Sequence, residues 1–521
     1  MRLKVLGRNI ATVGFMVLLM LAAVTGCPSR NNNGTGGSNS TSSAPESPES
    51  GGAKKQVKEK YYEPLFTNWS KPKVAIAITG EQLGYIEPCG CAGLENQKGG
   101  LGRRHALLKK LRSDGWPLIA FDLGSQVRRS GAQAAIKYHR TREALEKLKY
   151  DALAFGLEDI RRLSIDTIDP QLYEGKAIHV GANVNIYDAP EIQPFRIIEV
   201  NGYKIGVTAI FGSEYQQLVP NSDIKFSDPQ DALPQVIQEM QKENCDLLVL
   251  LSHAPLEESR KLAQKFPDFD VVVTAGGADE PPLKLEVIEG TKTKFIELGH
   301  KAMYAGVIGF FPGSDEPLRY QKVPLDSRPE FAPTEEMKQL LAEYQVELQS
   351  LGFAGLEVFP VKHPRGAGAE NPRMGLFAGA ESCKQCHKKA WGKWSKSNHA
   401  KATKTLIESK PPRQFDPECI SCHVTGWNPQ EYFPYESGFL SVEKTPHLVG
   451  NSCENCHGPG AAHVEAEKNN DRASLAKLRD IMKLRIGDAE LTVCRKCHDL
   501  DNSPEFNLET YWEKVKHPGK D

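Results

Sequence analysis

Short apolar runs alternate with amphipathic stretches from Lys71 to about Asp326. Apolar runs bounded by turn residues are typical of buried strands, and an apolar position every three or four residues is typical of helices. The predicted strands are 74–78, 118–121, 177–180, 204–207, 247–251 and 271–273, and the predicted helices are 102–112, 133–148, 233–242 and 257–265. This order suggests an α/β fold in which helices cover both faces of a sheet.

The first 26 residues follow a different pattern. Arg2, Lys4 and Arg8 precede an apolar run, 10–24, which ends in Val-Thr-Gly before Cys27. A positive segment followed by a short apolar segment indicates a secretion signal. The ending resembles the lipobox of bacterial lipoproteins, which implies that Cys27 becomes the mature N-terminus and carries lipid. The alternative is an uncleaved anchor, for which the run is short because a span needs about 20 residues. Both interpretations place the chain outside the cytoplasm, tethered to a membrane.

Two further segments divide the chain. Residues 27–70 begin with Ser, Asn, Gly and Pro and few apolar residues, which predicts a flexible tether. Residues 333–351 predict a helix capped by Thr334, and the Gly- and Pro-rich residues 363–379 predict a linker. The predicted domains are therefore an α/β domain at 71–325, a helical connector and linker at 326–375, and a third domain at 376–521.

The bulk composition is that of ordinary globular protein, with 40% hydrophobic and 25% charged residues. A formal net charge of −1 gives no field that would attract nucleic acid, so we expect no such partner. The 12 cysteines are more informative, because eight of them belong to four Cys-x-x-Cys-His units.

These units are typical of covalent c-type haem attachment. Two thiols add to the vinyl groups of one haem, and the adjacent His becomes the proximal iron ligand. Structural zinc also uses paired cysteines, but it does not require His after every second Cys. The predicted thioether residues are Cys383, Cys386, Cys419, Cys422, Cys453, Cys456, Cys494 and Cys497, and the predicted proximal ligands are His387, His423, His457 and His498. Four haems would supply most of the core of this short domain, so its apo-protein is predicted not to fold.

The sequence around the units resembles the tetrahaem cytochromes c that accept electrons from hydroxylamine oxidoreductase. The resemblance covers about 145 residues and rests on 394–402, 419–426, 453–463 and the stretch from Cys494 to His517. It implies a mostly α-helical, loop-rich domain in which three haems have two His ligands and one lacks a protein sixth ligand. By this resemblance His399, His463 and His517 are distal ligands and the haem on His423 is open. His447 is an alternative ligand that would close it.

Residues 71–325 resemble the calcineurin-like metallophosphatase domain of secreted 5′-nucleotidases, which implies a β-sandwich flanked by helices. The resemblance rests on the order of motifs at the strand ends. Ser125 stands where that family has a bridging Asp, and Leu157-Glu158 stand where it has Asn-His. Two-metal hydrolysis needs such ligands. Only a weak residual metal site, at Glu81, His253 and Asp279, is therefore expected, with a divalent metal as its ligand.

Cys89-Gly90-Cys91 follows the first predicted strand, where an α/β domain builds its site. The pair is interpreted as a redox-active pair, a soft-metal site or a structural feature, with the redox interpretation favoured by similar exported relatives. Cys245 is expected to be a small buried residue.

The sequence thus predicts an exported, membrane-anchored, multihaem cytochrome c fused to a degenerate metallophosphatase-like domain. Electron transfer is the expected function, with redox proteins or a membrane quinol as partners. The alternatives are a haem oxidoreductase acting on a small nitrogen or oxygen compound at an open iron, and an exported phosphoesterase with accessory haems.

Overall fold

The computed structural model describes residues 61–90, 93, 96–162, 178–186, 192–220 and 222–519. Residues 62–521 form one compact unit. The predicted signal segment, Cys27, most of the predicted tether and Cys91 lie outside the described residues. Within the described ranges, no helix combines the length and the apolar character that crossing a bilayer requires.

The α/β region contains two main sheets. The first has the order β13-β12-β1-β2-β3 and the second has the order β10-β11-β9-β8-β6-β5. The first sheet comprises β13 (Leu318–Pro324), β12 (Tyr304–Phe310), β1 (Val74–Thr79), β2 (Leu118–Asp122) and β3 (Ala152–Leu153). The second comprises β10 (Glu286–Val287), β11 (Lys294–Glu297), β9 (Val271–Gly276), β8 (Leu247–Pro255), β6 (Tyr203–Phe211) and β5 (Phe195–Val200). A further pair joins β4 (Val184–Ile186) to β7 (Ile224–Phe226).

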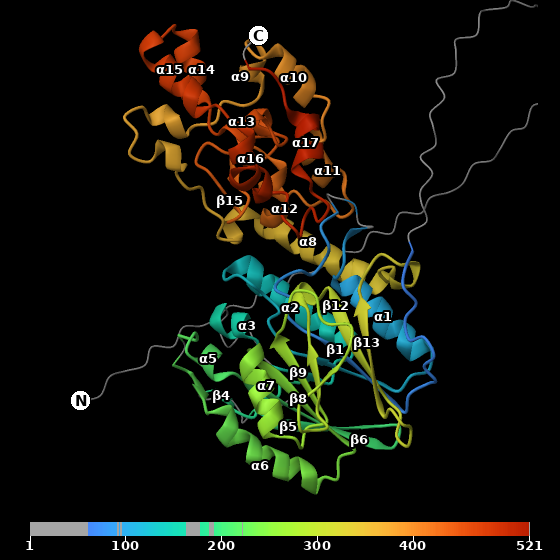
Figure 1. The fold of residues 1–521 in the computed structure, drawn as a ribbon. Helices are drawn as coiled ribbons and strands as arrows, with labels where there is room; N and C mark the ends of the chain where they lie inside the picture. The colour runs from blue at the N-terminus through green and yellow to red at the C-terminus, as the bar shows by residue number, and fades with distance from the viewer. Residues whose placement is uncertain are drawn as a thin grey trace, which may run out of the picture. The chain divides into compact units, whose positions relative to one another are not determined.

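The two sheets stack face to face, and the single sheet suggested by the order of elements is wrong. One apolar core combines Ile76 and Phe121 of the first sheet with Val249 and Val273 of the second. The outer face of the first sheet packs on α1 (Leu101–Ser113), α2 (Ala132–Lys147) and α8 (Glu335–Gly355). The outer face of the second sheet packs on α6 (Pro229–Lys242) and α7 (Leu256–Lys265), as Figure 1 shows. The β-sandwich flanked by helices is confirmed.

The parallel strands β1, β2 and β3 end at one edge of the first sheet, and β8 ends nearby. The short helix α3 (Leu157–Arg162) follows β3, and α5 (Ser213–Gln216) follows β6. Of the predicted strand 177–180, the described residues 178–180 form a single isolated bridge, between His179 and Leu153. In the second sheet β6, β8, β9 and β11 are parallel.

The predicted connecting helix is α8, and its apolar face is confirmed except at one position. Met337, Tyr344 and Leu348 are buried, whereas Val346 is 60% exposed. Thr334 is the N-cap residue, but its hydroxyl hydrogen-bonds His105 Nδ1 at 2.9 Å and does not cap the helix. Two 3-10 turns, η6 (Pro364–Gly366) and η7 (Pro372–Gly375), lie in the predicted linker.

The C-terminal region is helical and rich in loops, as expected. Its longer elements are α10 (Lys388–Trp394), α11 (Ala402–Glu408), α12 (Pro417–His423), α14 (Ala461–Lys468), α15 (Arg472–Ile481), α16 (Ile486–Thr492) and α17 (Leu508–Val515). The shorter ones are α9 (Glu381–Lys384), η8 (His399–Lys401), β14 (Trp427–Asn428), β15 (Phe433–Pro434), η9 (Pro446–Leu448), α13 (Cys453–His457) and η10 (Cys494–Lys496). Apolar packing is sparse: among the described residues its two clusters contain six and four buried residues.

Candidate functional site

Each Cys-x-x-Cys-His unit is built on a helical turn. Unit 1 (383–387) begins on α9, unit 2 (419–423) lies on α12, unit 3 (453–457) is α13, and unit 4 (494–498) begins on η10. The His387 N–H donates to Cys383 O at 3.0 Å, and the His498 N–H donates to Cys494 O at 2.8 Å. A helical turn places residues three apart on one face. Both thiols of a unit are therefore presented together with the following imidazole.

Three of the predicted proximal histidines are oriented by a hydrogen bond at Nδ1. The partners are Ala402 O for His423 at 2.7 Å and Met482 O for His457 at 2.6 Å. His498 Nδ1 contacts Ser503 Oγ at 3.1 Å. Because a carbonyl oxygen only accepts, Nδ1 of His423 and of His457 carries the proton. Nε2 then keeps its lone pair, which is the form of His that ligates iron.

Two pairs of imidazole rings lie close together, with their planes inclined by 47° in one pair and by 54° in the other. The ring centroids of His399 and His498 are 6.1 Å apart, and those of His457 and His517 are 5.8 Å apart. Two imidazoles that share one metal through nitrogen bonds of about 2 Å have centroids about 6 Å apart. The side chains present therefore fit an iron between two His at units 3 and 4. Burial lowers the pKa of His457 and lowers that of His498 to about 4, which favours the neutral ligand form.

The other two predicted distal residues lie on either side of unit 3 in the sequence. His463 is half-buried in the first turn of α14, and that turn is fixed by a bond from the Ala461 N–H to Leu376 O at 3.1 Å. His447 is exposed and lies against Gly379, just before α9. The carbonyl oxygen of the next residue, Leu448, accepts the N–H of Thr425 at 2.9 Å, and Thr425 is two residues after His423. Whether His447 completes unit 2 stays a prediction.

Three pairs of units are neighbours. Cys453 raises the pKa of the Cys383 thiol, Cys497 raises that of Cys422, and burial together with Cys494 raises that of Cys456. Unit 1 therefore lies near unit 3, unit 3 near unit 4, and unit 4 near unit 2, which gives the order 1, 3, 4, 2.

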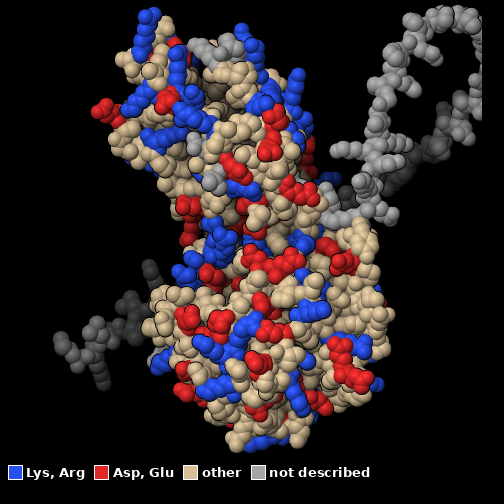
Figure 2. Space-filling model, viewed as in Figure 1, with Lys and Arg blue, Asp and Glu red and all other residues tan. Residues whose placement is uncertain are grey.

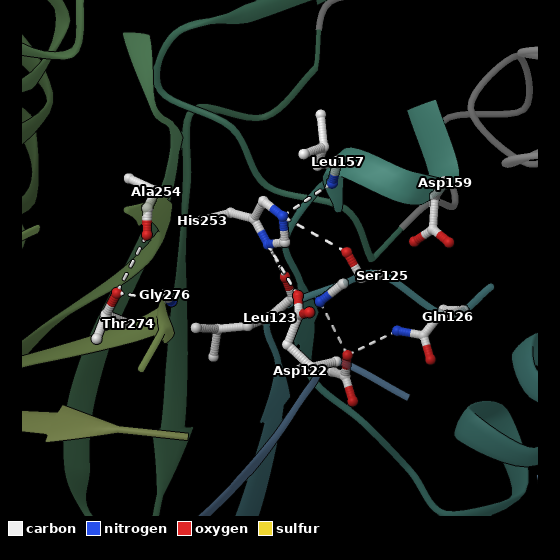
Figure 3. Close-up of polar contacts among 12 residues, drawn as sticks. Asp122, Leu123, Ser125, Gln126, Leu157, Asp159, His253, Ala254, Thr274 and Gly276 are labelled. Carbon is white, nitrogen blue, oxygen red and sulfur yellow. Dashed lines mark hydrogen bonds and ion pairs between the residues drawn. The ribbon is translucent and has the colours of Figure 1, made fainter. Parts of the chain in front are cut away.

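The strand-end site of the α/β region is also assembled, but not as a metal site. His253, on β8, donates from Nδ1 to Leu123 O at 2.8 Å, and its Nε2 accepts the Leu157 N–H at 2.8 Å (Figure 3). The Ser125 hydroxyl lies 3.5 Å from the same Nε2. The lone pair that a metal ion would need is therefore already used. Burial lowers the pKa of His253 to about 4, so the ring is neutral.

Asp122 lies beside His253 and is saturated by protein donors. Its carboxylate accepts the Thr79 hydroxyl at 2.6 Å and the Gln126 amide at 2.7 Å, and it pairs with the Arg104 guanidinium at 3.4 Å. Arg104 is 1% exposed. A buried guanidinium thus supplies the positive charge that balances this carboxylate.

Two other acids of this site have raised pKa values. Burial, together with nearby carboxylates, raises the pKa of Glu81 to about 8 and that of Asp159 to about 7. Asp279 is exposed, and its backbone oxygen accepts the His300 N–H at 3.0 Å. No group of three or more His, Cys, Asp or Glu in the described part of the chain is placed to hold a metal ion. The predicted residual site at Glu81, His253 and Asp279 is therefore not assembled, since both ring nitrogens of His253 are engaged.

Cys89 lies in the segment between β1 and α1. It is half-buried and interacts electrostatically with both cysteines of unit 2, Cys419 and Cys422. Its predicted redox partner Cys91 lies outside the described residues. Cys245 is half-buried and packs against the α6 side of the second sheet, close to its predicted role.

Comparisons with known proteins match the chain to two kinds of protein. Residues 382–458 match the family described as Cytochrome c554 and c-prime. Over 122 residues the chain is 30% identical to cytochrome c-554 of Nitrosomonas europaea, covering 21% of this chain and 48% of that protein. Over 182 residues it is 25% identical to the 5′-nucleotidase of Rattus norvegicus, covering 34% of this chain and 32% of that protein. A 5′-nucleotidase precursor from Thermus thermophilus has a TM-score of 0.45 and 19% identity, over 53% of this chain and 59% of that chain.

Both resemblances seen in the sequence are thereby confirmed. The C-terminal region is similar to a multihaem cytochrome c, and the α/β region is similar to 5′-nucleotidases. The chain spans about half of the cytochrome relative and about a third of the nucleotidase relative.

Several residues that organise the site were not predicted. Glu454, within unit 3, is 2% exposed and accepts the N–H groups of Ala378, Gly379 and Gly460 at 2.7–2.8 Å. Lys137 and Glu418 join α2 to the helix of unit 2. A buried Glu inside a Cys-x-x-Cys unit is a weak signal by itself, and a charge pair 281 residues apart has no sequence signal.

Proposed function

We propose that this chain is an exported, membrane-tethered electron-transfer protein with four c-type haems in residues 376–521. The single observation that carries the proposal is the pairing of His399 with His498 and of His457 with His517 at ligation distance. Two imidazoles on one iron favour a low-spin centre that exchanges electrons with little rearrangement.

The side chains of this region have three tasks. The eight unit cysteines attach the haems, and His387, His423, His457 and His498 supply the proximal nitrogens. His399 and His517 supply distal nitrogens at units 4 and 3, and His463 supplies a third distal nitrogen. Bound haem supplies reversible one-electron chemistry at each iron. The protein sets the spacing of the centres, through the unit order 1, 3, 4, 2, and sets their polarity.

The partner at the unit 1 end is proposed to be an acidic redox protein. Residues 381–410 contain eight lysines and two acids, Glu381 and Glu408. Lys388, Lys396 and Lys401 are exposed, and basic side chains gather over α10 in Figure 2. A one-signed surface steers an oppositely charged partner to the nearest redox centre.

The α/β region is proposed to act in electron transfer and not in phosphoester hydrolysis. Its His253 accepts a hydrogen bond from the Leu157 N–H, and its Asp122 pairs with Arg104. These side chains are therefore not available as ligands for two-metal hydrolysis. The Cys89–Cys91 pair is proposed to be redox active, and the interaction of Cys89 with unit 2 supports this role. Lipidation at Cys27 is proposed to hold the protein at the membrane, within reach of a quinol-linked donor.

A redox titration of mature protein tests the proposal. Four haem irons per chain, with low-spin spectra at two or more of them, are expected. A chain that binds zinc at its Cys-x-x-Cys-His units and no haem would refute it. Nucleotide hydrolysis that depends on added divalent metal and is lost in His253→Ala would instead favour a phosphoesterase.

A further inference from the structure

The helix that carries unit 2 begins in a hydrogen-bond cluster shared with the α/β region. Asp416, 4% exposed, is the N-cap of α12 and accepts the Glu418 N–H at 3.0 Å. The same carboxylate accepts the Gln133 amide of α2 at 2.9 Å and the Gln345 amide of α8 at 3.1 Å. The cap that starts α12 is thus completed by two helices outside the C-terminal region.

An ion pair between a buried lysine and a partly exposed glutamate stands one residue before the first cysteine of unit 2. Lys137 Nζ, on α2, lies 2.6 Å from Glu418 Oε2 and also donates to Gly84 O at 3.0 Å. The Lys137 side chain is 7% exposed and that of Glu418 is 34% exposed. One ammonium group therefore ties the loop that follows β1 to the helix of unit 2.

A second ion pair ties the same loop to the segment that precedes unit 2. Glu87 Oε2 lies 2.5 Å from Arg413 Nη2, in the segment that leads into α12. Two residues further along the loop, Cys89 is one of the nearby groups that raise the pKa of Cys419 and of Cys422. The loop from Gly80 to Cys89, which includes Glu81 of the degenerate strand-end site, is thus bonded to α2 through Gly84 and to the segment before α12 through Glu87.

We propose that the loop from Gly80 to Cys89 forms a wall of the haem site of unit 2, and that Lys137 and Glu418 are positioning residues that set the reduction potential of that haem. This deepens the proposed function, on which it rests. The α/β region is a structural part of one redox centre. The edge of the sheet that would hold metal ions in a phosphatase is used to hold and tune a haem.

The two charges of the pair must act on the potential with opposite signs. A buried ion pair that loses one partner leaves an uncompensated charge in a medium of low dielectric. Lys137→Met leaves the Glu418 carboxylate, which stabilises the oxidised, more positive iron and lowers the potential. Glu418→Gln leaves the Lys137 ammonium, which raises it. The double variant restores neutrality and returns the potential towards that of the parent.

The test is a redox titration of the complete haem-loaded chain, followed by visible and EPR spectra. We expect each single variant to change the reduction equilibrium of one haem of the four by about tenfold, or about 59 mV for a one-electron couple, in opposite directions. The matched control is Lys322→Met. Lys322 is also a buried lysine, on β13, 2.9 Å from Glu280 Oε1 and 2.9 Å from Pro281 O. It should leave all four potentials unchanged.

The outcomes separate this inference from the proposed function. Four haems that titrate normally, with no centre shifted in either single variant, overturn the inference and leave electron transfer standing. Shifts of the same sign in both single variants, or shifts spread equally over all four haems, also overturn it. A chain without titrating haems overturns the proposed function itself. If Lys137→Met fails to load haem, the potential of Glu418→Gln still tests the inference. This variant should fold, since its amide oxygen can accept a hydrogen bond from Lys137.

Discussion

The α/β region and the C-terminal region differ in how much apolar side-chain packing each contains. Among the described residues, the largest apolar cluster of the α/β region joins 22 buried residues from two sheets, whereas the C-terminal clusters have six and four. The C-terminal region instead uses short helices around paired thiols and imidazoles. Burial of side-chain area stabilises the first region, and we expect the second to depend on groups that its cysteines attach.

The two regions also differ in what their polar groups do. In the α/β region Asp122 and His253 are satisfied by neighbouring protein groups, which leaves a closed, fully bonded site. In the C-terminal region the Nδ1 bonds of His423 and His457 leave each Nε2 oriented for a ligand. The comparison teaches that the polar groups of the strand-end site are bonded by neighbouring protein groups, whereas these imidazoles of the C-terminal region are oriented through Nδ1.

Preventing haem attachment should give the largest difference between the two regions. Expression without the cytochrome c maturation system should leave the C-terminal region unfolded, because its side chains bury too little apolar area to offset the entropy of ordering. The α/β region should stay folded. Limited proteolysis checks this, and a haem-free chain that resists cleavage throughout residues 376–521 would contradict the dependence on haem.

Loss of the Glu454 carboxylate should destabilise only the C-terminal region. Glu454→Ala removes three hydrogen bonds to backbone N–H groups and leaves those donors buried, at a cost of about 3 kcal/mol. Glu454→Gln, which keeps one acceptor oxygen, should cost less. Urea unfolding followed at the haem absorption band measures this loss. Equal stability of Glu454→Ala and of the surface control Glu443→Ala would disprove the role.

Removing the charge of Glu81 should stabilise the α/β region in a pH-dependent way. Its pKa of about 8, against an ordinary 4.5, means that the folded chain holds an extra proton between these pH values. Folding stability therefore falls as pH rises through this window and levels off above pH 8. Glu81→Gln should be more stable than the parent by about 2 kcal/mol at pH 9 and equal to it at pH 4. Thermal unfolding at both pH values provides the check; a gain that is the same at pH 4 would mean that Glu81 is not protonated by burial.

Reversing the lysine charge near unit 1 should have the smallest effect. Lys388→Glu, Lys396→Glu and Lys401→Glu together should slow oxidation of the reduced protein by anionic ferricyanide about tenfold at low salt. Oxidation by a cationic cobalt–phenanthroline complex should not slow. The control reverses Lys261, Lys284 and Lys292, which are exposed on the α/β region. Stopped-flow kinetics that respond equally to both triple variants would rule out a specific docking surface.

The sequence predicted the elements better than their assembly. The helix predicted at 102–112 is Leu101–Ser113, and the strand predicted at 204–207 is Tyr203–Phe211, since local periodicity carries this information. The division into two stacked sheets depends on pairings such as Val74 with Phe310, which local patterns do not encode. The antiparallel return of β12 to β1 was therefore missed.

The haem units were predictable because covalent chemistry fixes their spacing. The distal residues His399 and His517 came from a resemblance, and the structure places each ring across from a proximal one. Asp279 was assigned by its order along the chain, and it forms no metal-binding group with Glu81 and His253, because order does not determine side-chain proximity. The joining of unit 2 to α2 rests on Lys137 and Glu418, whose charges look like ordinary surface charges in the sequence.

The most direct test of the central claim is the haem stoichiometry and spin state of the mature chain. Intact mass spectrometry together with EPR of the oxidised protein gives both. We predict a mass that corresponds to four attached haems, and low-spin signals from the centres at units 3 and 4. Fewer than four attached haems, or high-spin iron at the centres flanked by His399 and His517, would contradict the account.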